Sequence, residues 1–167
     1  MNPAKKDMFL ALLRISMGFI FLWAFLDKLL GLGFATITEK SWLNGQSPTA
    51  GFLKFGTHGP FKSFFESLAG NSIVDYLFMF GLLGIGISLV LGIARKISTL
   101  SGTLMLFLMW LATFPPANNP FVDEHIIYIF VLIVFASFRV GRVWGLERWC
   151  ARLPICARCP RVRNWLG

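Results

Sequence analysis

Four long apolar runs restrict what this chain can fold into more than any other feature of its sequence. They cover residues 8–30, 73–93, 97–114 and 121–140. Each is close to the length of about 20 residues that an α-helix needs to cross a bilayer. Hydrophobic residues make up 56% of the 167 residues and charged residues only 14%, against about 25% charged residues in soluble domains. We therefore predict an all-α, polytopic membrane protein with a four-helix bundle.

The basic residues between the runs predict the orientation of the helices. Lys5 and Lys6 precede the first run, and Arg95 and Lys96 separate the second from the third. Basic residues near membrane helices concentrate on the cytoplasmic side. We therefore expect both termini in the cytoplasm, a long extracytoplasmic loop over residues 31–72, and a location in a prokaryotic-type cytoplasmic membrane.

The net charge of +8 comes largely from the end of the chain. Seven of the 16 basic residues follow Phe138; they are Arg139, Arg142, Arg148, Arg152, Arg158, Arg161 and Arg163. A basic segment directly after a membrane helix indicates orientation and contact with anionic lipid headgroups. We expect no nucleic-acid partner, and we divide the chain into a membrane domain at 1–149 and a basic cytoplasmic tail at 150–167.

The cysteines and histidines argue against an intrinsic redox centre. Cys150, Cys156 and Cys159 all lie in the predicted tail, so none stands beside the outer loops. Zinc and iron–sulfur sites normally take four ligands. The only histidines are His58 and His125, whereas b-type haem in a bundle usually has paired helical histidines. We predict reduced thiols in the tail and neither intrinsic haem nor metal.

Arg14 is a charged residue inside the first apolar run. With a rotation of about 100° per residue, Arg14, Gly18, Phe21, Phe25 and Lys28 share one helix face. An arginine at the centre of a membrane helix costs about 2.5–3.5 kcal/mol on insertion scales, so it normally faces a partner or a cavity. Near a helix end it can instead extend its head to the membrane surface. Both interpretations of Arg14 stand.

Small residues recur in the second apolar run at a spacing of four. Gly84, Ser88 and Gly92 fall on one helix face. Such a stripe allows helix backbones in lipid to approach closely. We expect this face to pack against a neighbouring helix.

Ionisable and phenolic side chains gather at the predicted outer ends of the helices. They are Asp27, Lys28, Asp75, Tyr76, Asp123, Glu124, His125 and Tyr128. One interpretation is an interfacial belt, since acids favour helix starts and aromatic residues favour the membrane surface. The other is an outward-facing polar site, in which Lys28 and His125 bind an anion or donate protons and Asp123 orients His125.

An ordered set of short motifs runs from about Leu12 to Trp149. They are Arg14-Ile-Ser-Met-Gly18, Phe25-Leu-Asp-Lys28, Trp42-Leu-Asn-Gly45, Ser47-Pro-Thr-Ala-Gly-Phe-Leu53, Gly59-Pro-Phe61, Asp75-Tyr-Leu-Phe78, Gly102-Thr-Leu-Met105, Asn119-Pro120 and Trp144-Gly-Leu-Glu-Arg-Trp149. In these motifs the chain resembles the DoxX/DoxD family of small four-helix membrane proteins. The resemblance implies a four-helix bundle. In the best-known members it also implies the membrane subunit of a thiosulfate:quinone oxidoreductase, which passes electrons from thiosulfate to quinone and gives tetrathionate.

Two functions stay open at this point, and with them the question of whether the chain is an enzyme. The first is a membrane subunit of a quinone-linked oxidoreductase, with quinone as cofactor and aromatic residues such as Trp23, Phe25 and Trp110 around it. The second is a non-catalytic accessory subunit of a larger respiratory-type complex. Both imply the bilayer and other protein subunits as partners. We predict the catalytic residues Lys28, Asp123 and His125, and the substrate- or quinone-binding residues Arg14, Asp27, Trp42, Asp75, Tyr76 and Tyr128.

Overall fold

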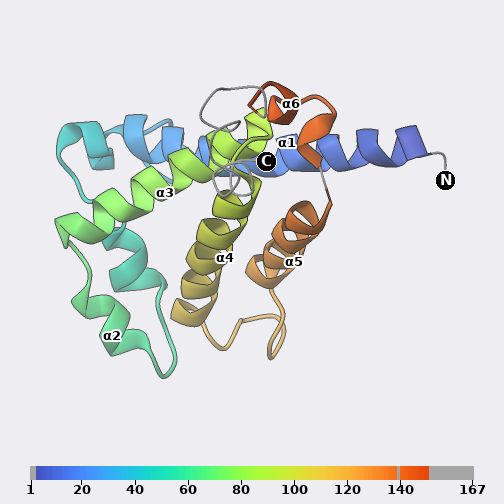
Figure 1. Ribbon diagram of the computed structural model, residues 1–167. Helices are drawn as coiled ribbons and strands as arrows, with labels where there is room; N and C mark the ends of the chain where they lie inside the picture. Colours follow the sequence, from blue (N-terminus) through green and yellow to red (C-terminus); the bar gives the residue numbers. More distant parts are fainter. Residues whose placement is uncertain (1–2, 139, 151–167) are drawn as a thin grey trace.

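The computed structural model describes residues 3–138 and 140–150, and within these residues it contains helices and no strand. The helices are α1 (Pro3–Leu30), α2 (Lys62–Ser67), α3 (Ser72–Leu91), α4 (Arg95–Ala112), α5 (Glu124–Ser137) and α6 (Glu147–Cys150) (Figure 1). Short helical turns are η1 (Thr38–Lys40), η2 (Trp42–Asn44), η3 (Phe52–Gly56) and η4 (Val140–Arg142). The prediction of an all-α chain is confirmed. Cys156 and Cys159 of the predicted tail lie outside the described residues.

Two of the helices are long and apolar enough to cross a membrane. They are Ala4–Leu30, with 27 residues, and Ser72–Leu91, with 20 residues. The apolar helix α5 has 14 residues and is about 21 Å long at 1.5 Å per residue. Residues 3–138 and 140–150 thus contain two candidate membrane spans, while the four spans and the orientation of the termini stay predictions.

Local signals set the ends of the long helices. The side chain of Asn71 accepts a hydrogen bond from the backbone N–H of Ile73 at the start of α3. Helix α3 ends at Gly92, whose φ of 68° is left-handed and suits glycine. Asp123 caps the start of α5, and extended Phe138 follows its end. These signals make the fourth predicted helix shorter than residues 121–140.

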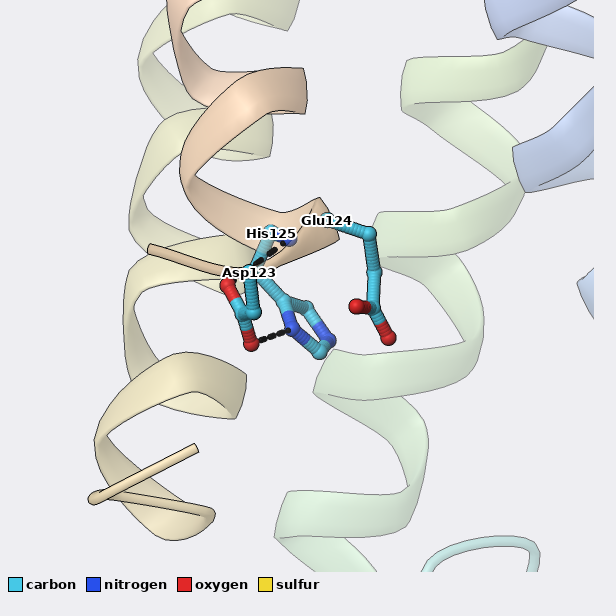
Figure 2. A group of neighbouring side chains, drawn as sticks. All are labelled: Asp123, Glu124 and His125. Carbon is cyan, nitrogen blue, oxygen red and sulfur yellow. Dashed lines mark hydrogen bonds and ion pairs between the residues drawn. The ribbon is translucent and has the colours of Figure 1, made fainter. Parts of the chain in front are cut away.

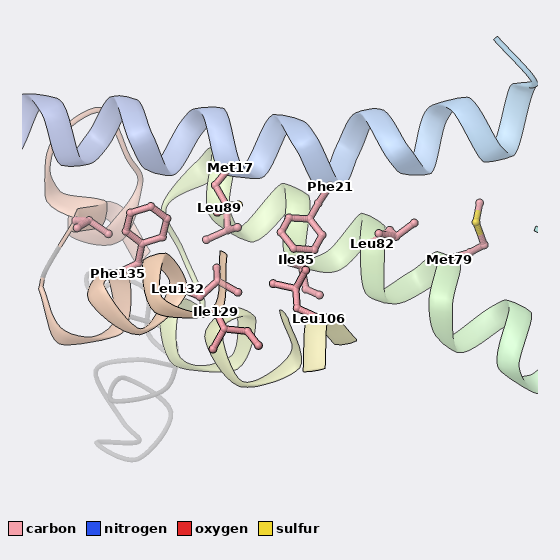
Figure 3. Packing of buried hydrophobic residues seen from close by; sticks show 11 residues of the cluster. Met17, Phe21, Met79, Leu82, Ile85, Leu89, Leu106, Ile129, Leu132 and Phe135 are labelled. Atoms are coloured by element: carbon pink, nitrogen blue, oxygen red, sulfur yellow. The ribbon is translucent and has the colours of Figure 1, made fainter. Parts of the chain in front are cut away.

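The helices form two pairs, α1 with α3 and α4 with α5, joined by one apolar core. In Figure 1, α4 and α5 lie side by side and run steeply to α1. Figure 3 shows the core where the pairs meet, and its buried residues are Met17, Phe21, Met79, Leu82, Ile85, Leu89, Leu106, Ile129, Leu132, Phe135 and Val140. This core joins α1 to α3, and α3 to α4 and α5.

Glycines bring α1 and α3 together, and of the two glycines in the predicted stripe Gly92 lies against Arg14 of α1 whereas Gly84 does not contact α1. A Cβ on Gly18 would lie 2.8 Å from the backbone nitrogen of Val90, and one on Gly86 would lie 2.6 Å from Leu22. A Cβ on Gly84 would have no described atom within 4 Å. The prediction was therefore wrong for Gly84, because the face of α3 that meets α1 carries Gly86 instead.

Candidate functional site

A cavity of about 780 Å³ lies between α3 and α4, and we call it the α3–α4 cavity. Its walls are almost entirely apolar. They include Phe78, Gly81 and Ile85 from α3, Ser101, Met105 and Met109 from α4, and Phe52, Leu53, Phe65 and Leu68 from the first loop. Lys28, from the last turn of α1, is the one charged residue among the described lining residues. The volume falls in the range of about 300–1,000 Å³ that is typical of small-molecule sites.

The ammonium group of Lys28 is available to a ligand. Among the described residues it makes no hydrogen bond or ion pair. Its nearest recorded contact is the ring of Phe78, 5.9 Å from Nζ to the ring centroid, which is the outer limit of about 6 Å for a cation–π contact. A cation in an apolar setting gains from a hydrogen-bond acceptor. The cavity would therefore favour a ligand that brings such an acceptor.

Tyr76 and Trp42 stand at the rim of the site. Tyr76 lines the α3–α4 cavity and is 53% exposed. Trp42 packs edge-on against it, with ring centroids 5.3 Å apart. Trp42 itself is not among the lining residues, so the structure gives it a role in holding Tyr76.

The carboxylates of Asp27 and Asp75 are buried and hold the first loop. Asp75 accepts hydrogen bonds from the hydroxyl groups of Ser47, at 2.8 Å, and Thr49. Asp27 accepts from the backbone N–H groups of Phe34, at 3.2 Å, and Ala35, at 3.0 Å. Both carboxylates therefore hold the first loop, and the charge of Asp27 also acts on Lys28 at the cavity.

Asp123, Glu124 and His125 form a second polar group at the start of α5 (Figure 2). Oδ1 of Asp123 accepts from the backbone N–H of His125, and Oδ2 lies 2.8 Å from Nδ1 of His125. The structure thus brings together the pair in which Asp123 was expected to orient His125; their catalytic role stays a prediction.

The same group has three side chains of metal-binding types. One ligand atom from each of Asp123, Glu124 and His125 lies within 4.8 Å of the others. Asp123 also caps α5 and engages Nδ1 of His125, so its carboxylate already has partners within the protein. Fewer ligands than the four of a structural zinc site are present.

The predicted catalytic residues therefore separate into two places. Lys28 lies at the α3–α4 cavity, whereas Asp123 and His125 are not among its lining residues. Tyr128, one turn after His125, packs against the apolar core instead. A reaction that used all three catalytic residues would need a ligand or a proton path between these places.

Arg14 lies near the middle of α1 (Pro3–Leu30), about 21 Å from Lys28 by helix rise. It is only 1% exposed. Its guanidinium donates to the carbonyls of Leu89 and Val90 at the end of α3, and to those of Val143, at 3.3 Å, and Trp144, at 2.8 Å. Of the two interpretations of Arg14, the partner inside the protein is confirmed. The structure gives no contact between Arg14 and the other predicted site residues in its described part.

Several residues at these sites were not singled out from the sequence. Thr49 and Ser101 supply hydroxyl groups to the cavity wall, and Glu147 is a buried carboxylate whose charge acts on Arg14. A lone acid among the arginines after Phe138 was a signal for Glu147. No periodicity marks Thr49, because the folding of the loop alone brings it to the cavity.

The aromatic residues expected around a quinone lie elsewhere. Trp23, Phe25 and Trp110 are not among the cavity-lining residues. Trp23 packs edge-on against Phe34, and the indole N–H of Trp110 donates to the carbonyl of Phe121. Phenylalanines of α3 and of the first loop line the cavity in place of Trp23, Phe25 and Trp110.

No family model, no curated protein and no solved structure matches this chain. The likeness to the DoxX/DoxD family therefore rests on the ordered motifs of the sequence alone.

Proposed function

We propose that the chain is a multi-pass protein of the cytoplasmic membrane and the membrane subunit of a quinone-linked oxidoreductase, with quinone bound in the α3–α4 cavity. One observation carries this proposal. An apolar cavity of about 780 Å³ meets a single ammonium group, that of Lys28, which the described residues leave without a hydrogen-bond partner. A quinone fits such a cavity, because its apolar ring and chain suit the apolar walls and its carbonyl oxygens can accept a hydrogen bond from the ammonium group.

Lys28 also suits the chemistry of quinone reduction. Negative charge develops on the quinone oxygens as electrons arrive, and a fixed cation beside one oxygen stabilises that charge. The ring of Phe78 near Nζ of Lys28 offers an apolar surface to the quinone ring. Lys28 would thus bind the quinone carbonyl and stabilise its reduced form.

The DoxX/DoxD resemblance supports thiosulfate as the electron donor. Two thiosulfate anions join through a new S–S bond to give tetrathionate, and the two electrons released pass with two protons to the quinone, which becomes quinol. Thiosulfate is a strongly hydrated dianion, so the apolar walls of the cavity exclude it. Its oxidation would take place outside the cavity, in a partner subunit of the same complex.

His125 fits proton transfer better than anion binding. The carboxylates of Asp123 and Glu124 stand beside it, and two negative charges oppose an anionic substrate. Asp123 engages Nδ1, which leaves Nε2 to pass a proton to water, and water would carry it to the α3–α4 cavity, because His125 does not line that cavity. We assign His125 to proton delivery at the outer end of α5.

The proposal is tested on protein purified with its native lipids. Extraction and mass spectrometry should find quinone in stoichiometric amount in the wild type and in Lys40→Met, whose side chain is exposed in the loop, but not in Lys28→Met. With thiosulfate, membranes that contain the complex should form quinol. Wild-type protein that neither retains quinone nor binds it saturably would refute the proposal. A co-purifying subunit that reduces quinone alone would instead make this chain an accessory subunit.

A further inference from the structure

A segment of the first loop covers the outer end of the α3–α4 cavity, and we call residues 47–69 the cover segment. It contains η3 and α2, which in Figure 1 lie between the outer ends of α3 and α4. Leu53 and Phe65 are buried and pack with Ala112 of α4. Together with Phe52 and Leu68 they line the cavity. The cover segment therefore forms its outer wall.

Polar contacts fasten the cover segment to both helices. On α3, Asp75 accepts hydrogen bonds from Ser47 and Thr49. At the end of α4, the backbone N–H of His58 donates to the carbonyl of Ala112, at 3.2 Å, and Nε2 of His58 lies 3.0 Å from the carbonyl oxygen of Pro115. The cover segment is thus held on the two helices that form the cavity.

Gly59 makes the closest approach of the cover segment to the end of α4. It has a φ of +74°, and a Cβ at this position would overlap the carbonyl oxygen of Phe114. Only glycine allows both this conformation and this approach. Gly59 therefore allows the cover segment to pack closely against the end of α4.

The cavity is open on a different side. Lining residues that are more than a third exposed stand along both helices; on α3 they are Tyr76, Leu77 and Phe80, and on α4 they are Ser101, Leu104 and Leu108. α3 is one of the two candidate membrane spans. In a membrane, a strip of exposed apolar side chains along such a helix faces lipid.

From these contacts we infer that the α3–α4 cavity is closed toward water by the cover segment and open toward lipid between α3 and α4. The inference rests on the proposed function and names the class of ligand for the same site. The ligand is an amphiphile dissolved in the membrane, with an uncharged hydrogen-bond acceptor at its head. It enters sideways, head toward Lys28 near the membrane surface, and its chain lies between α3 and α4.

The lipid side is tested by narrowing the opening in protein reconstituted in lipid nanodiscs. The probe is a short-chain ubiquinone added to the bilayer, and its binding is followed by quenching of the native tryptophans. Ser101→Phe places a ring in the opening and should weaken binding about tenfold or more, as overfilling of a packed site does. Leu100→Phe is the matched control, because Leu100 is 63% exposed and does not line the cavity. Its binding should equal that of the wild type.

The water side is tested with a sulfonated naphthoquinone, which does not dissolve in the bilayer. Wild-type protein should show no saturable binding of this probe. Gly59→Ala pushes the cover segment away from Phe114 and should allow binding. Gly45→Ala is the control, because Gly45 has a similar φ of +77° but no described atom within 4 Å of a Cβ. It shares the backbone strain and should still exclude the probe.

The outcomes separate this inference from the proposed function. If the sulfonated quinone binds the wild type as tightly as the membrane-dissolved one, access is from water and the inference is wrong, although a quinone site remains. The same holds if Ser101→Phe and Leu100→Phe bind alike, or if Gly59→Ala excludes the probe as Gly45→Ala does. If a long-chain methyl ketone, whose head is an uncharged carbonyl, binds from the bilayer and no quinone does, the lateral opening stands and the oxidoreductase proposal fails.

Discussion

Two cations of the same helix, Arg14 near its middle and Lys28 in its last turn, have opposite surroundings. Arg14 is 1% exposed, and its guanidinium meets four backbone carbonyls from two distant segments. Lys28, later in α1, faces a cavity of about 780 Å³ and has no hydrogen bond or ion pair among the described residues. The cation near the middle of α1 is therefore bound by the protein itself, whereas the cation in the last turn of α1 is left to a ligand.

The comparison teaches that a charge in an apolar helix has no single meaning. A guanidinium has five N–H donors in a planar fork and can join several carbonyls at once. An ammonium is a compact charge that suits one or two acceptors of a ligand. Arginine therefore suits the position that meets four backbone carbonyls, and lysine suits the position that faces the cavity.

The largest effect on stability is expected from removing the cation of Arg14. Arg14→Met leaves the carbonyls of Leu89, Val90, Val143 and Trp144 without the donor that Arg14 supplies. Loss of one member of a buried polar group costs about 3–5 kcal/mol. Thermal unfolding in detergent should show a large loss of stability, while Lys5→Met, an exposed position of α1, should leave it unchanged. Equal stability of the two variants would mean that the contacts of Arg14 do not stabilise the protein.

Two glycines of the same region give the next effect and should act in opposite directions. Gly92→Ala forces a left-handed residue to carry a Cβ, which costs about 1–2 kcal/mol, and directs that Cβ onto the guanidinium of Arg14. Gly84→Ala meets no described atom within 4 Å, and in a helix interior it should stabilise by about 0.5–1 kcal/mol. Chemical denaturation of both variants measures the difference. If both variants raise the free energy of unfolding, the packing around Arg14 tolerates a methyl group at position 92.

The long helices were predictable from the sequence because each depends on local signals. The second apolar run was predicted at 73–93 and the structure places α3 at Ser72–Leu91, since Asn71 and Gly92 mark its ends. The helix α2, Lys62–Ser67, was predicted only as loop. A helix this short is not stable by itself; it forms because Phe65 is buried against α4.

The candidate site was predictable only where its residues are neighbours in the sequence. Asp123 and His125 meet because both stand at one helix start. The partners of Arg14 could not be predicted, since Trp144 lies 130 residues further along the chain. The contact between Thr49 and Asp75 likewise depends on how the whole first loop folds. Sequence reasoning identified Lys28 but not the cavity beside it.

Removing the cation of Lys28 should weaken ligand binding and leave the stability of the protein nearly unchanged. Lys28→Met keeps the length of the side chain and removes a charge that makes no hydrogen bond or ion pair with the described residues. Loss of one charge-assisted hydrogen bond to a quinone carbonyl should weaken binding about tenfold, or ~1.4 kcal/mol. Isothermal titration in nanodiscs and thermal unfolding of the same sample give both numbers. A large loss of stability with unchanged binding would reverse the comparison between Lys28 and Arg14.

The smallest change in stability is expected at the second polar group of the outer end, where one carboxylate does two things. Asp123 caps α5 through the N–H groups of His125 and Ile126, and it also engages Nδ1 of the His125 ring. Asp123→Ser keeps the cap, because serine and aspartate are about equal at this position, whereas Asp123→Ala should cost about 1 kcal/mol. Asp123→Ser removes only the carboxylate from His125, so quinol formation should fall while the unfolding temperature stays that of the wild type. If activity follows stability across both variants, Asp123 acts only as a cap, and the outer end has Lys28 as its one functional charge in the described chain.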